Sequence, residues 1–333
     1  MDRLFANFHR ARVLIVGDVM VDEYLVGNAT RISPEAPVPV VEITGRRYAA
    51  GGAANVALNA VGLGAHVRLL GLVGKDSSAG LLGEILRNSG IDPETLVTTQ
   101  RPTISKSRVM SGQQQIVRFD VEDRSALPLG VCAELLNRFA FLLGESDLCI
   151  ISDYGKGVVS PEFSQAAIQL ARKQNKPIVV DPKGRDYSKY MGCTLLTPNQ
   201  KEAAIATDIV AETENDVVKA GRSLLSTLPG SSVLITRGPD GMSLFRPNKD
   251  PLTISTEAQN VFDVVGAGDT VIATLGVSMA ARLNLETAVT LSNIAAGIVV
   301  GKHGTVAVTR DELLAYARTS TSLRNALNGR LCA

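Results

Sequence analysis

Residues 13–18 read Val-Leu-Ile-Val-Gly-Asp, a short apolar run that ends in glycine and aspartate. A run that is apolar at every position predicts a strand buried on both faces, as in a parallel sheet covered by helices. The pattern returns at 148–153 and 177–181, where each apolar run again ends in aspartate. Stretches with helical spacing lie between these runs, so the sequence predicts βαβ units.

Strands and helices are expected to alternate over most of the chain. The strands are expected at 13–16, 67–73, 148–152, 177–180 and 233–236. The helices are expected at 52–63, 77–88, 128–144, 161–174, 199–207, 213–228, 270–281 and 287–301. This alternation predicts an α/β fold with a mostly parallel central sheet and helices on both of its faces.

Two regions depart from this alternation and have the character of exposed β-structure. Residues 23–47 are rich in β-branched residues and prolines, and residues 103–121 alternate polar and apolar side chains. Both regions resemble antiparallel strands with one wetter face. They predict a small β-sheet attached to the α/β body, which serves as a lid over a site or as an oligomer contact.

The composition limits the partners and the compartment. With 34 Lys and Arg against 33 Asp and Glu, the chain has no net charge that would gather nucleic acid or an anionic membrane. Four dispersed cysteines and a polar N-terminus predict a cytoplasmic protein. Only three histidines are present, so we expect carboxylates to carry any acid–base chemistry. The apolar segments 270–281 and 287–301 are shorter than the ~20 residues of a membrane span.

The strongest chemical motif is Asp-Val-Val-Gly-Ala-Gly-Asp-Thr at 263–270, directly before an apolar helix. Gly266, Ala267 and Gly268 let backbone amides approach a ligand, and free amides at a helix N-terminus bind anions. Asp269 would lie beside that anion, where a carboxylate can accept the proton of a hydroxyl that attacks a phosphoryl group. The alternative is a glycine-rich loop in which Asp269 only caps the helix.

Other polar motifs have a structural alternative that the residues alone leave open. Gly51, Gly52 and Asn55 begin a helix and suit a polyol ligand, or they mark a tightly packed helix start. Asn199 and Glu202 share a helix face and suit the waters of Mg²⁺ near nucleotide phosphates, or they form a capping box. The turn at 236–241 contacts phosphates or is a plain hairpin.

Carboxylates follow several of the expected strands, as Asp18, Asp76, Asp153 and Asp181 do. Ligands of open α/β sheets bind beyond the carboxyl ends of the strands, so these side chains are candidates for hydroxyls and a metal. An aspartate at such a position is equally typical of a turn or a helix cap.

Together these motifs resemble the ribokinase (PfkB) family of carbohydrate kinases, from about Val13 to Tyr316. Val264 stands where the family signature commonly has threonine. The resemblance implies a three-layer α/β body with a β lid, Asp269 as the catalytic base, and 266–268 as the anion hole. It implies ATP and Mg²⁺ at one group of residues: Asn199, Gln200, Lys201, Glu202, Thr236, Arg237, Gly238 and Gly241. Many members also bind a monovalent cation such as K⁺, here matched by Asp263, Val265 and the stretch 301–305.

A narrower resemblance lies in four runs, at 17–24, 31–40, 181–184 and 195–199, of which Arg-Ile-Ser-Pro-Glu-Ala-Pro-Val-Pro-Val at 31–40 is the most specific. They look like the family members that phosphorylate D-glycero-β-D-manno-heptose 7-phosphate at its anomeric hydroxyl, for ADP-heptose and the lipopolysaccharide core. In many bacteria that kinase is fused to an adenylyltransferase, and the end at Ala333 predicts the stand-alone form.

This acceptor already carries a phosphate, which predicts cations around it. The candidates are Arg108, Arg118, Lys183 and Arg185, and the alternative for each arginine is a solvated strand face. The sugar itself is assigned to the remaining predicted positions: Asp18, Asp22, Gly51, Gly52, Asn55 and Asp181.

The expected organisation is one kinase domain over 1–320, with lid strands from about 19–47 and 103–121, and a loosely docked tail at 321–333. The expected partners are a sugar phosphate, ATP and a second copy of the chain bound through the lid, because a sheet edge and an apolar face need cover. Two rivals remain: a family kinase for another sugar, sugar phosphate or nucleoside, and a sensor without catalysis. The intact Asp269, Asn199 and Glu202 favour an enzyme.

Overall fold

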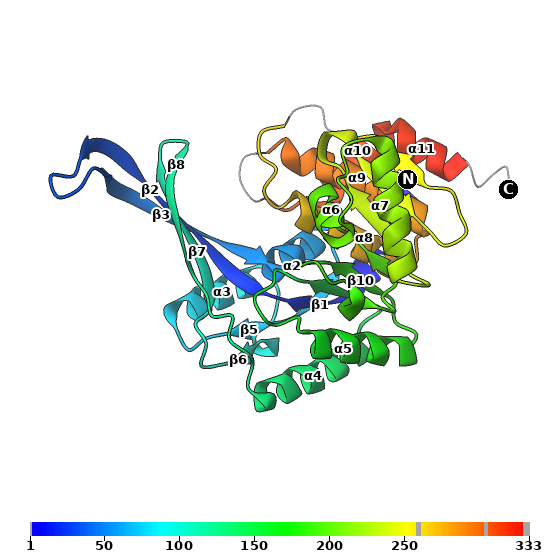
Figure 1. Ribbon diagram of the computed structural model, residues 1–333, viewed down its shortest axis with the longest axis horizontal. Coiled ribbons are helices and arrows are strands. Elements are labelled where there is room, and N and C mark those ends of the chain that lie inside the picture. The colour runs from blue at the N-terminus through cyan, green and yellow to red at the C-terminus, as the bar shows by residue number, and fades with distance from the viewer. Residues whose placement is uncertain (1, 258–260, 303–305, 329–333) are drawn as a thin grey trace.

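An eight-stranded sheet runs through the centre of the computed structural model, which describes residues 2–257, 261–302 and 306–328 (Figure 1). In spatial order its strands are β14 (Leu252–Ile254), β13 (Met242–Phe245), β12 (Ser232–Thr236), β11 (Leu195–Leu196), β10 (Ile178–Asp181), β9 (Leu148–Ser152), β1 (Arg12–Gly17) and β4 (His66–Leu70). All neighbours pair in parallel except β12–β13 and β13–β14. The prediction of a mostly parallel sheet is therefore confirmed.

Helices cover both faces of this sheet. One apolar core joins it to α2 (Ala53–Gly62), α8 (Ala267–Ala280), α9 (Leu285–Val300) and α10 (Arg310–Thr319). A second core joins the other face to α4 (Leu129–Gly144), α5 (Pro161–Lys173), α6 (Gln200–Thr207) and α7 (Glu214–Thr227). Successive residues of β1 alternate between the two cores, because side chains of a strand point to opposite faces.

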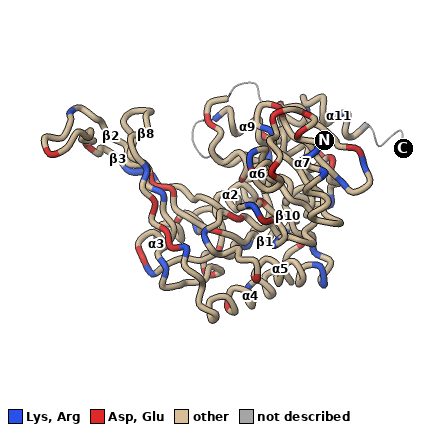
Figure 2. Tube along the Cα trace, in the orientation of Figure 1, with Lys and Arg blue, Asp and Glu red and all other residues tan. Residues whose placement is uncertain are grey.

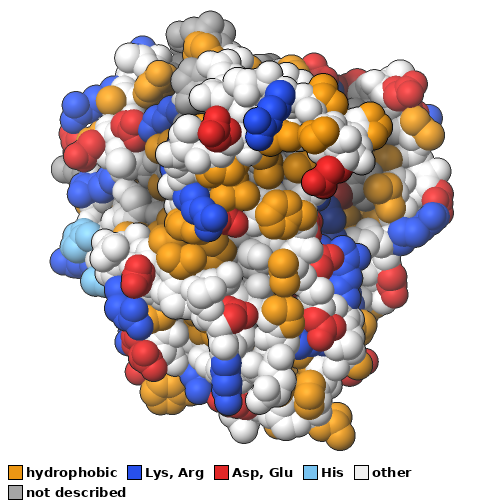
Figure 3. All heavy atoms as spheres, turned by 90° about the vertical axis from the view of Figure 1, so that its left-hand side faces the viewer, with side chains coloured by type: hydrophobic (Ala, Val, Ile, Leu, Met, Phe, Trp, Pro, Cys, Tyr) orange, Lys and Arg blue, Asp and Glu red, His pale blue; other side chains and the backbone are white. Residues whose placement is uncertain are grey.

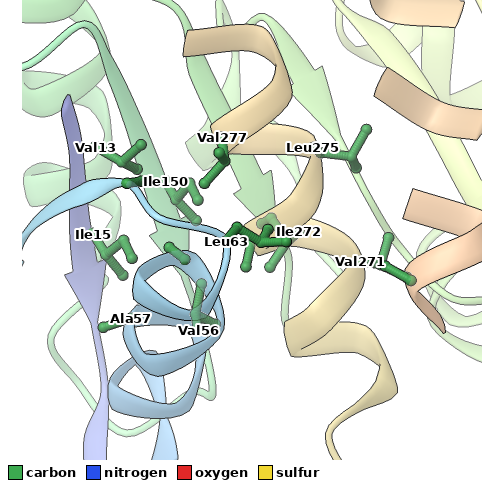
Figure 4. Packing of buried hydrophobic residues seen from close by; sticks show 14 of the residues in the cluster. Val13, Ile15, Val56, Ala57, Leu63, Ile150, Val271, Ile272, Leu275 and Val277 are labelled. Atoms are coloured by element: carbon green, nitrogen blue, oxygen red, sulfur yellow. The ribbon is translucent and has the colours of Figure 1, made fainter. Parts of the chain in front are cut away.

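Figure 4 shows the first core from close by, with Val13 and Ile15 of β1 beside Val56 of α2 and Ile272 of α8. The packing of α2 against α8 matters for the site, because these two helices carry Asn55 and Asp269.

A second, four-stranded sheet projects from the body (Figure 1). Its order is β3 (Pro39–Gly52), β2 (Val19–Ile32), β7 (Ile104–Ser111) and β8 (Gln114–Val121). The two regions expected to form a small sheet do so, but β2 and β7 pair in parallel, which corrects the expectation of antiparallel strands throughout. We refer to it as the small sheet.

Other elements are short or lie at the periphery. They are α1 (Asp2–Phe5), α3 (Ser77–Asn88), β5 (Leu72–Val73), β6 (Val97–Thr98), α11 (Thr321–Asn328) and four short 3-10 helices at Phe8–Arg10, Pro93–Thr95, Ser188–Tyr190 and Gly238–Asp240. The expected strand at 67–73 is divided into β4 and β5, which belong to different sheets.

The expectation of a loosely docked tail is wrong for 321–328. These residues form α11, which contacts α9, and Leu323 is fully buried in the first core. Residues 329–333 lie outside the described part of the chain. Within the described ranges, no helix has both the length and the apolarity that a membrane crossing requires.

Candidate active site

Asp269 lies in the first turn of α8, where its carboxylate is held from two sides. The amide of Asn55 and the hydroxyl of Tyr154 each donate a hydrogen bond of 2.6 Å, one to each carboxylate oxygen. Asp269 is only 6% exposed, and this burial raises its pKa to about 6, although the two hydrogen bonds act in the opposite direction. A carboxylate with such a pKa can take up and release a proton near neutral pH.

The start of α8 leaves room for an anion beside this carboxylate. Gly266 is the N-cap residue with φ of +81°, a left-handed conformation that favours glycine. A Cβ atom placed on Gly268 would meet open space, so the first turn is accessible from the outside. Of the amides that the motif predicted for an anion site, the Ala267 N–H donates to the backbone oxygen of Val264 at 3.3 Å, and Gly268 is exposed at the helix N-terminus.

Asn55 is fixed by polar contacts between α2 and α8. The amide of Asn59 donates to the backbone oxygen of Asn55 at 2.9 Å, and the Thr270 hydroxyl donates to the side-chain oxygen of Asn59 at 2.8 Å. These three side chains are buried between the helices. These hydrogen bonds link α2 to α8 and hold Asn55 where its amide meets Asp269. Each residue in this series of hydrogen bonds belongs to one of these two helices.

Tyr154 was not predicted from the sequence, and Asp18 lies at the end of β1 as expected but makes different contacts from those predicted. The Asp18 carboxylate is fully buried and accepts backbone N–H groups of Tyr154, Lys156 and Val158 at 2.9, 3.0 and 3.1 Å. Desolvation raises the pKa of Asp18. Because both oxygens are used inside the protein, the prediction that Asp18 contacts a sugar does not fit; it shapes the loop that carries Tyr154.

A cavity of about 210 Å³ opens beside Asp269 at the carboxyl ends of the strands. Eight of the predicted site residues line it, together with Asp153 and Tyr154: Asp181, Lys183, Asn199, Glu202, Thr236, Gly266, Gly268 and Asp269. Desolvation, followed by the nearby Glu202, raises the pKa of Asp181 well above its ordinary range. Several carboxylates thus face one small space, which favours a cation or a phosphate-bound metal there.

A second cavity of about 270 Å³ adjoins the first and shares Thr236, Gly268 and Val271 with it. The predicted Gly238 and Gly241 line it, and most of its remaining surface is apolar, from Val264, Ala296 and other residues. An apolar slot next to an anion-binding helix start suits the planar base of a nucleotide.

Asn199 and Glu202 form the capping box that was the structural alternative. The Asn199 side-chain oxygen accepts the Glu202 N–H at 3.0 Å, and one Glu202 carboxylate oxygen accepts the Asn199 N–H at 3.0 Å. The other Glu202 oxygen lies 2.8 Å from the Lys183 ammonium. Among the described residues, no group of three or more His, Cys, Asp or Glu side chains is arranged to hold a metal ion.

Several predicted side chains line neither cavity, among them Gln200, Lys201, Arg185 and Arg237. Gln200 donates to the backbone oxygen of Ala211, and Lys201 is exposed on α6. Arg237 pairs with Glu214 at 2.6 Å, and Arg185 pairs with Asp208 on the surface. In each case a nearer acceptor or the solvent satisfies the polar group of the side chain, which the spacing of the motif does not reveal.

The glycine pair before α2 has a packing role. A Cβ atom on Gly51 would lie 2.5 Å from the Asp22 carboxylate, and one on Gly52 would lie 2.3 Å from the Asp18 backbone oxygen. Asp22 in turn pairs with Arg108 at 2.7 Å. The glycines therefore let the end of β3 approach β2, which brings Asp22 close to Asn55 and Asp269.

The loop proposed for a monovalent cation has an internal hydrogen bond between two of its predicted residues. The Asp263 carboxylate accepts the N–H of Val265 at 2.9 Å. Of the companion stretch 301–305, residues 303–305 lie outside the described part of the chain.

Comparison with known proteins gives one family match, to the pfkB family of carbohydrate kinases over residues 10–312. Two similar relatives are both called bifunctional protein HldE. That of Caulobacter vibrioides is 45% identical over 326 residues, covering 96% of this chain and 67% of the relative. That of Histophilus somni is 44% identical over 329 residues, covering 98% and 66%. The chain thus spans about two thirds of the length of these relatives.

Solved structures with a similar fold include Arabidopsis thaliana ribokinase complexed with ribose and ATP, with a TM-score of 0.74 at 19% identity. That match covers 93% of this chain and 99% of the other. Escherichia coli phosphofructokinase-2 in complex with potassium has a TM-score of 0.75 at 19% identity, covering 92% and 98%. The three-layer body with its small sheet is therefore ribokinase-like, as expected from the sequence.

Proposed function

The chain belongs to the pfkB family of carbohydrate kinases, and from this premise we propose that its acceptor is D-glycero-β-D-manno-heptose 7-phosphate. The product would be heptose 1,7-bisphosphate, on the route to ADP-heptose and the lipopolysaccharide core. The run at 31–40 and the identity of 44–45% to relatives called HldE support this choice over another sugar, sugar phosphate or nucleoside.

The observation that carries the kinase chemistry is the Asp269 carboxylate at the start of α8. In the proposed reaction Asp269 accepts the proton of the anomeric hydroxyl as that oxygen attacks the γ-phosphorus of ATP, while the bond from the γ-phosphorus to the bridging oxygen breaks and ADP leaves. The amides of 266–268 would donate to the oxygens of the transferring phosphoryl group. Proton transfer comes late, because a carboxylate is a weak base toward a hydroxyl that has not yet lost charge to phosphorus.

ATP is proposed to lie across the two adjoining cavities, with its base in the apolar one near Gly238 and Gly241. Mg²⁺, when bound with ATP, would neutralise charge on the polyphosphate. The residues fit a metal held mainly by phosphate and water, since Asn199 and Glu202 already use oxygens in the helix cap. Asp181 lines the same cavity, and a cation there would favour its ionised form.

A monovalent cation near Asp263 and Val265 stays a proposal, supported by the potassium complex of the structurally similar phosphofructokinase-2. We also propose one kinase domain, which includes α11 because Leu323 is buried in the first core, and the cytoplasm as the compartment because the reaction consumes ATP.

A homodimer through the small sheet is supported by its outer face. Val117, Phe119 and Val121 of β8 are about half exposed there, and Tyr48 of β3 is 38% exposed. Figure 3 shows the side of the molecule from which the small sheet projects. Hydrophobic side chains gather near the centre of this view. Such a face on an edge strand calls for cover by another protein surface.

The experiment is an assay of ATP consumption with Mg²⁺ against a panel of sugars and sugar phosphates, with phosphorus NMR of the product. We expect turnover of heptose 7-phosphate and a new resonance from an anomeric phosphate. Turnover of unphosphorylated sugars alone would rule out this acceptor. Tight binding of a sugar phosphate without ATP consumption would support a sensor and rule out the kinase.

A further inference from the structure

The small sheet presents a row of cations on the face that looks toward Asp269. Tyr24 pairs with Arg108, and Arg108 pairs with Arg118, so their side chains project from the same face. The guanidinium groups of Arg47 and Arg108 lie 5.3 and 5.2 Å from the centre of the Tyr24 ring. Figure 2 shows basic and acidic residues interleaved along these strands where the small sheet meets the body.

Lys106 lies in the next row of the same face, closer to the body. In register it pairs with Asp22 of β2 and Asp120 of β8. Its ammonium lies 5.6 Å from the centre of the Tyr154 ring, and the Tyr154 hydroxyl donates to Asp269. The structure therefore brings a cation of the small sheet against the residue that holds the proposed base.

The ammonium of Lys106 makes no hydrogen bond or ion pair with another residue in the described ranges, apart from its contact with the Tyr154 ring. Asp22 bonds to Arg108 at 2.7 Å, and Asp120 bonds to Arg118 at 2.9 Å, so both nearby carboxylates already have a cation. Desolvation lowers the pKa of Lys106, so burial penalises its charged form. A bound anion would offset that cost.

Lys106 was not predicted from the sequence, and two of the cations that were predicted for an acceptor phosphate, Lys183 and Arg185, are engaged elsewhere. Lys183 lies 2.8 Å from Glu202 in the cavity proposed for the polyphosphate, and Arg185 pairs with Asp208 in a largely exposed contact. Lys156, which neighbours Tyr154, pairs with Glu122. These pairs leave the small sheet as the better source of positive charge on the acceptor side.

We propose that Lys106 binds the phosphate monoester carried by the acceptor, and that Arg118 in the next row completes the contact. This inference rests on the proposed function, because it takes the acceptor to be a sugar phosphate. The Arg118 side chain is 49% exposed, and it has donors left beyond those that bond Asp120. Lys106 would then be a specificity-determining residue, since its charge distinguishes a phosphorylated sugar from an unphosphorylated one.

The test compares wild type with Lys106→Met, which keeps the aliphatic stem and removes the charge. The kcat/KM values are measured for heptose 7-phosphate and for the same heptose without phosphate. Because a charge-assisted hydrogen bond contributes about 1.5–3 kcal/mol, the preference for the phosphorylated sugar should fall roughly 10- to 100-fold. Lys106→Arg should recover part of it, and Lys173→Met on α5 is the matched control, since Lys173 is exposed and remote.

An equal loss with both sugars would overturn the inference, because it would mean that Lys106 acts on the transferred phosphoryl group or on the fold. An unchanged preference would overturn it as well. Calorimetric titration with the sugar phosphate, without nucleotide, gives a second measurement if Lys106→Met lacks turnover. Failure of the proposed function looks different: wild type itself would not use heptose 7-phosphate. If it used another sugar phosphate, the same comparison with that acceptor would still test Lys106.

Discussion

Asp269 combines a raised pKa with two strong hydrogen bonds, and the two effects have separate origins. Burial at the base of α8 favours the protonated acid, whereas Asn55 and Tyr154 favour the carboxylate. Two nearby charges also act on the pKa of Asp269: Asp22 raises it and Lys106 lowers it. Asp181 lies near enough for the Asp269 charge to raise the pKa of Asp181 as well. The balance leaves a group that is mostly ionised at neutral pH and ready to accept a proton.

Asp269→Asn removes the proton acceptor while it keeps the shape of the side chain. We expect kcat to fall by about 10²- to 10⁴-fold, the usual contribution of a general base. The melting temperature should stay close to that of wild type or rise, because a buried carboxylate with a raised pKa is replaced by a neutral amide. Near-wild-type turnover by the folded variant would contradict the role of Asp269 as base.

The pH dependence of kcat/KM should report the same group. The base must be ionised, so activity should increase as pH rises through about 6. Tyr154→Phe removes a hydrogen bond that lowers the pKa of Asp269, so the acid limb should move to higher pH. Tyr316→Phe, at a half-exposed position on α10, should leave the limb in place. An acid limb that does not move in Tyr154→Phe would mean that this tyrosine does not tune the base.

At the scale of elements, the loop after β9 depends on a carboxylate from the end of β1. Asp18→Ala would leave three backbone N–H groups of residues 154–158, one buried and two part-buried, without their acceptor. We expect a loss on the order of 3 kcal/mol in the free energy of unfolding, since each unsatisfied group costs about 1–3 kcal/mol.

Urea unfolding provides the measurement for this loop, with Asp240→Ala as a control on an exposed turn. The control should change the free energy of unfolding by less than about 0.5 kcal/mol. Asp18→Asn, which keeps one acceptor oxygen, should fall between the two. A value for Asp18→Ala no larger than the control would show that the loop does not depend on this carboxylate.

The sequence predicted elements better than it predicted contacts between them. The buried strands, most helices and the Gly266–Asp269 motif follow from local periodicity and from glycine at a helix start, so they could be read directly. The pairing of β2 with β7 joins segments about 80 residues apart, and no local pattern encodes it. Tyr154 could have been suspected, because a tyrosine and two glycines follow the strand-ending Asp153.

Polar residues at the site were the least predictable. Asp18 and Asp22 have the same chemistry four positions apart, yet one is used by buried amides and the other lies beside Arg108. Likewise Arg237 lies in a motif that suits a phosphate, but its guanidinium forms an ion pair with a carboxylate from α7. Which partner a charged side chain meets depends on tertiary packing, and a single sequence contains no record of it.

For the whole molecule, the proposed dimer can be tested on the outer face of the small sheet. Phe119→Glu places a charge on a 48% exposed aromatic position, so it should convert a dimer into a monomer. Light scattering after size-exclusion chromatography gives the mass directly. Phe141→Glu changes an even more exposed phenylalanine on α4 and should leave the mass unchanged. A monomeric wild type, or a dimer that persists in Phe119→Glu, would contradict this interface.

The division of the molecule into two sheets bears on how such enzymes diversify. The α/β body carries Asp269, at the start of α8, and the cavities proposed for the nucleotide, whereas the cations proposed to select the acceptor stand on the small sheet. Substitutions farther out on the small sheet, such as at Arg118, can then change which sugar is accepted while Asp269 and the nucleotide cavities keep their residues. The two functions are free to evolve at different rates, and a designer who wants a new acceptor has four strands to redesign rather than a whole enzyme.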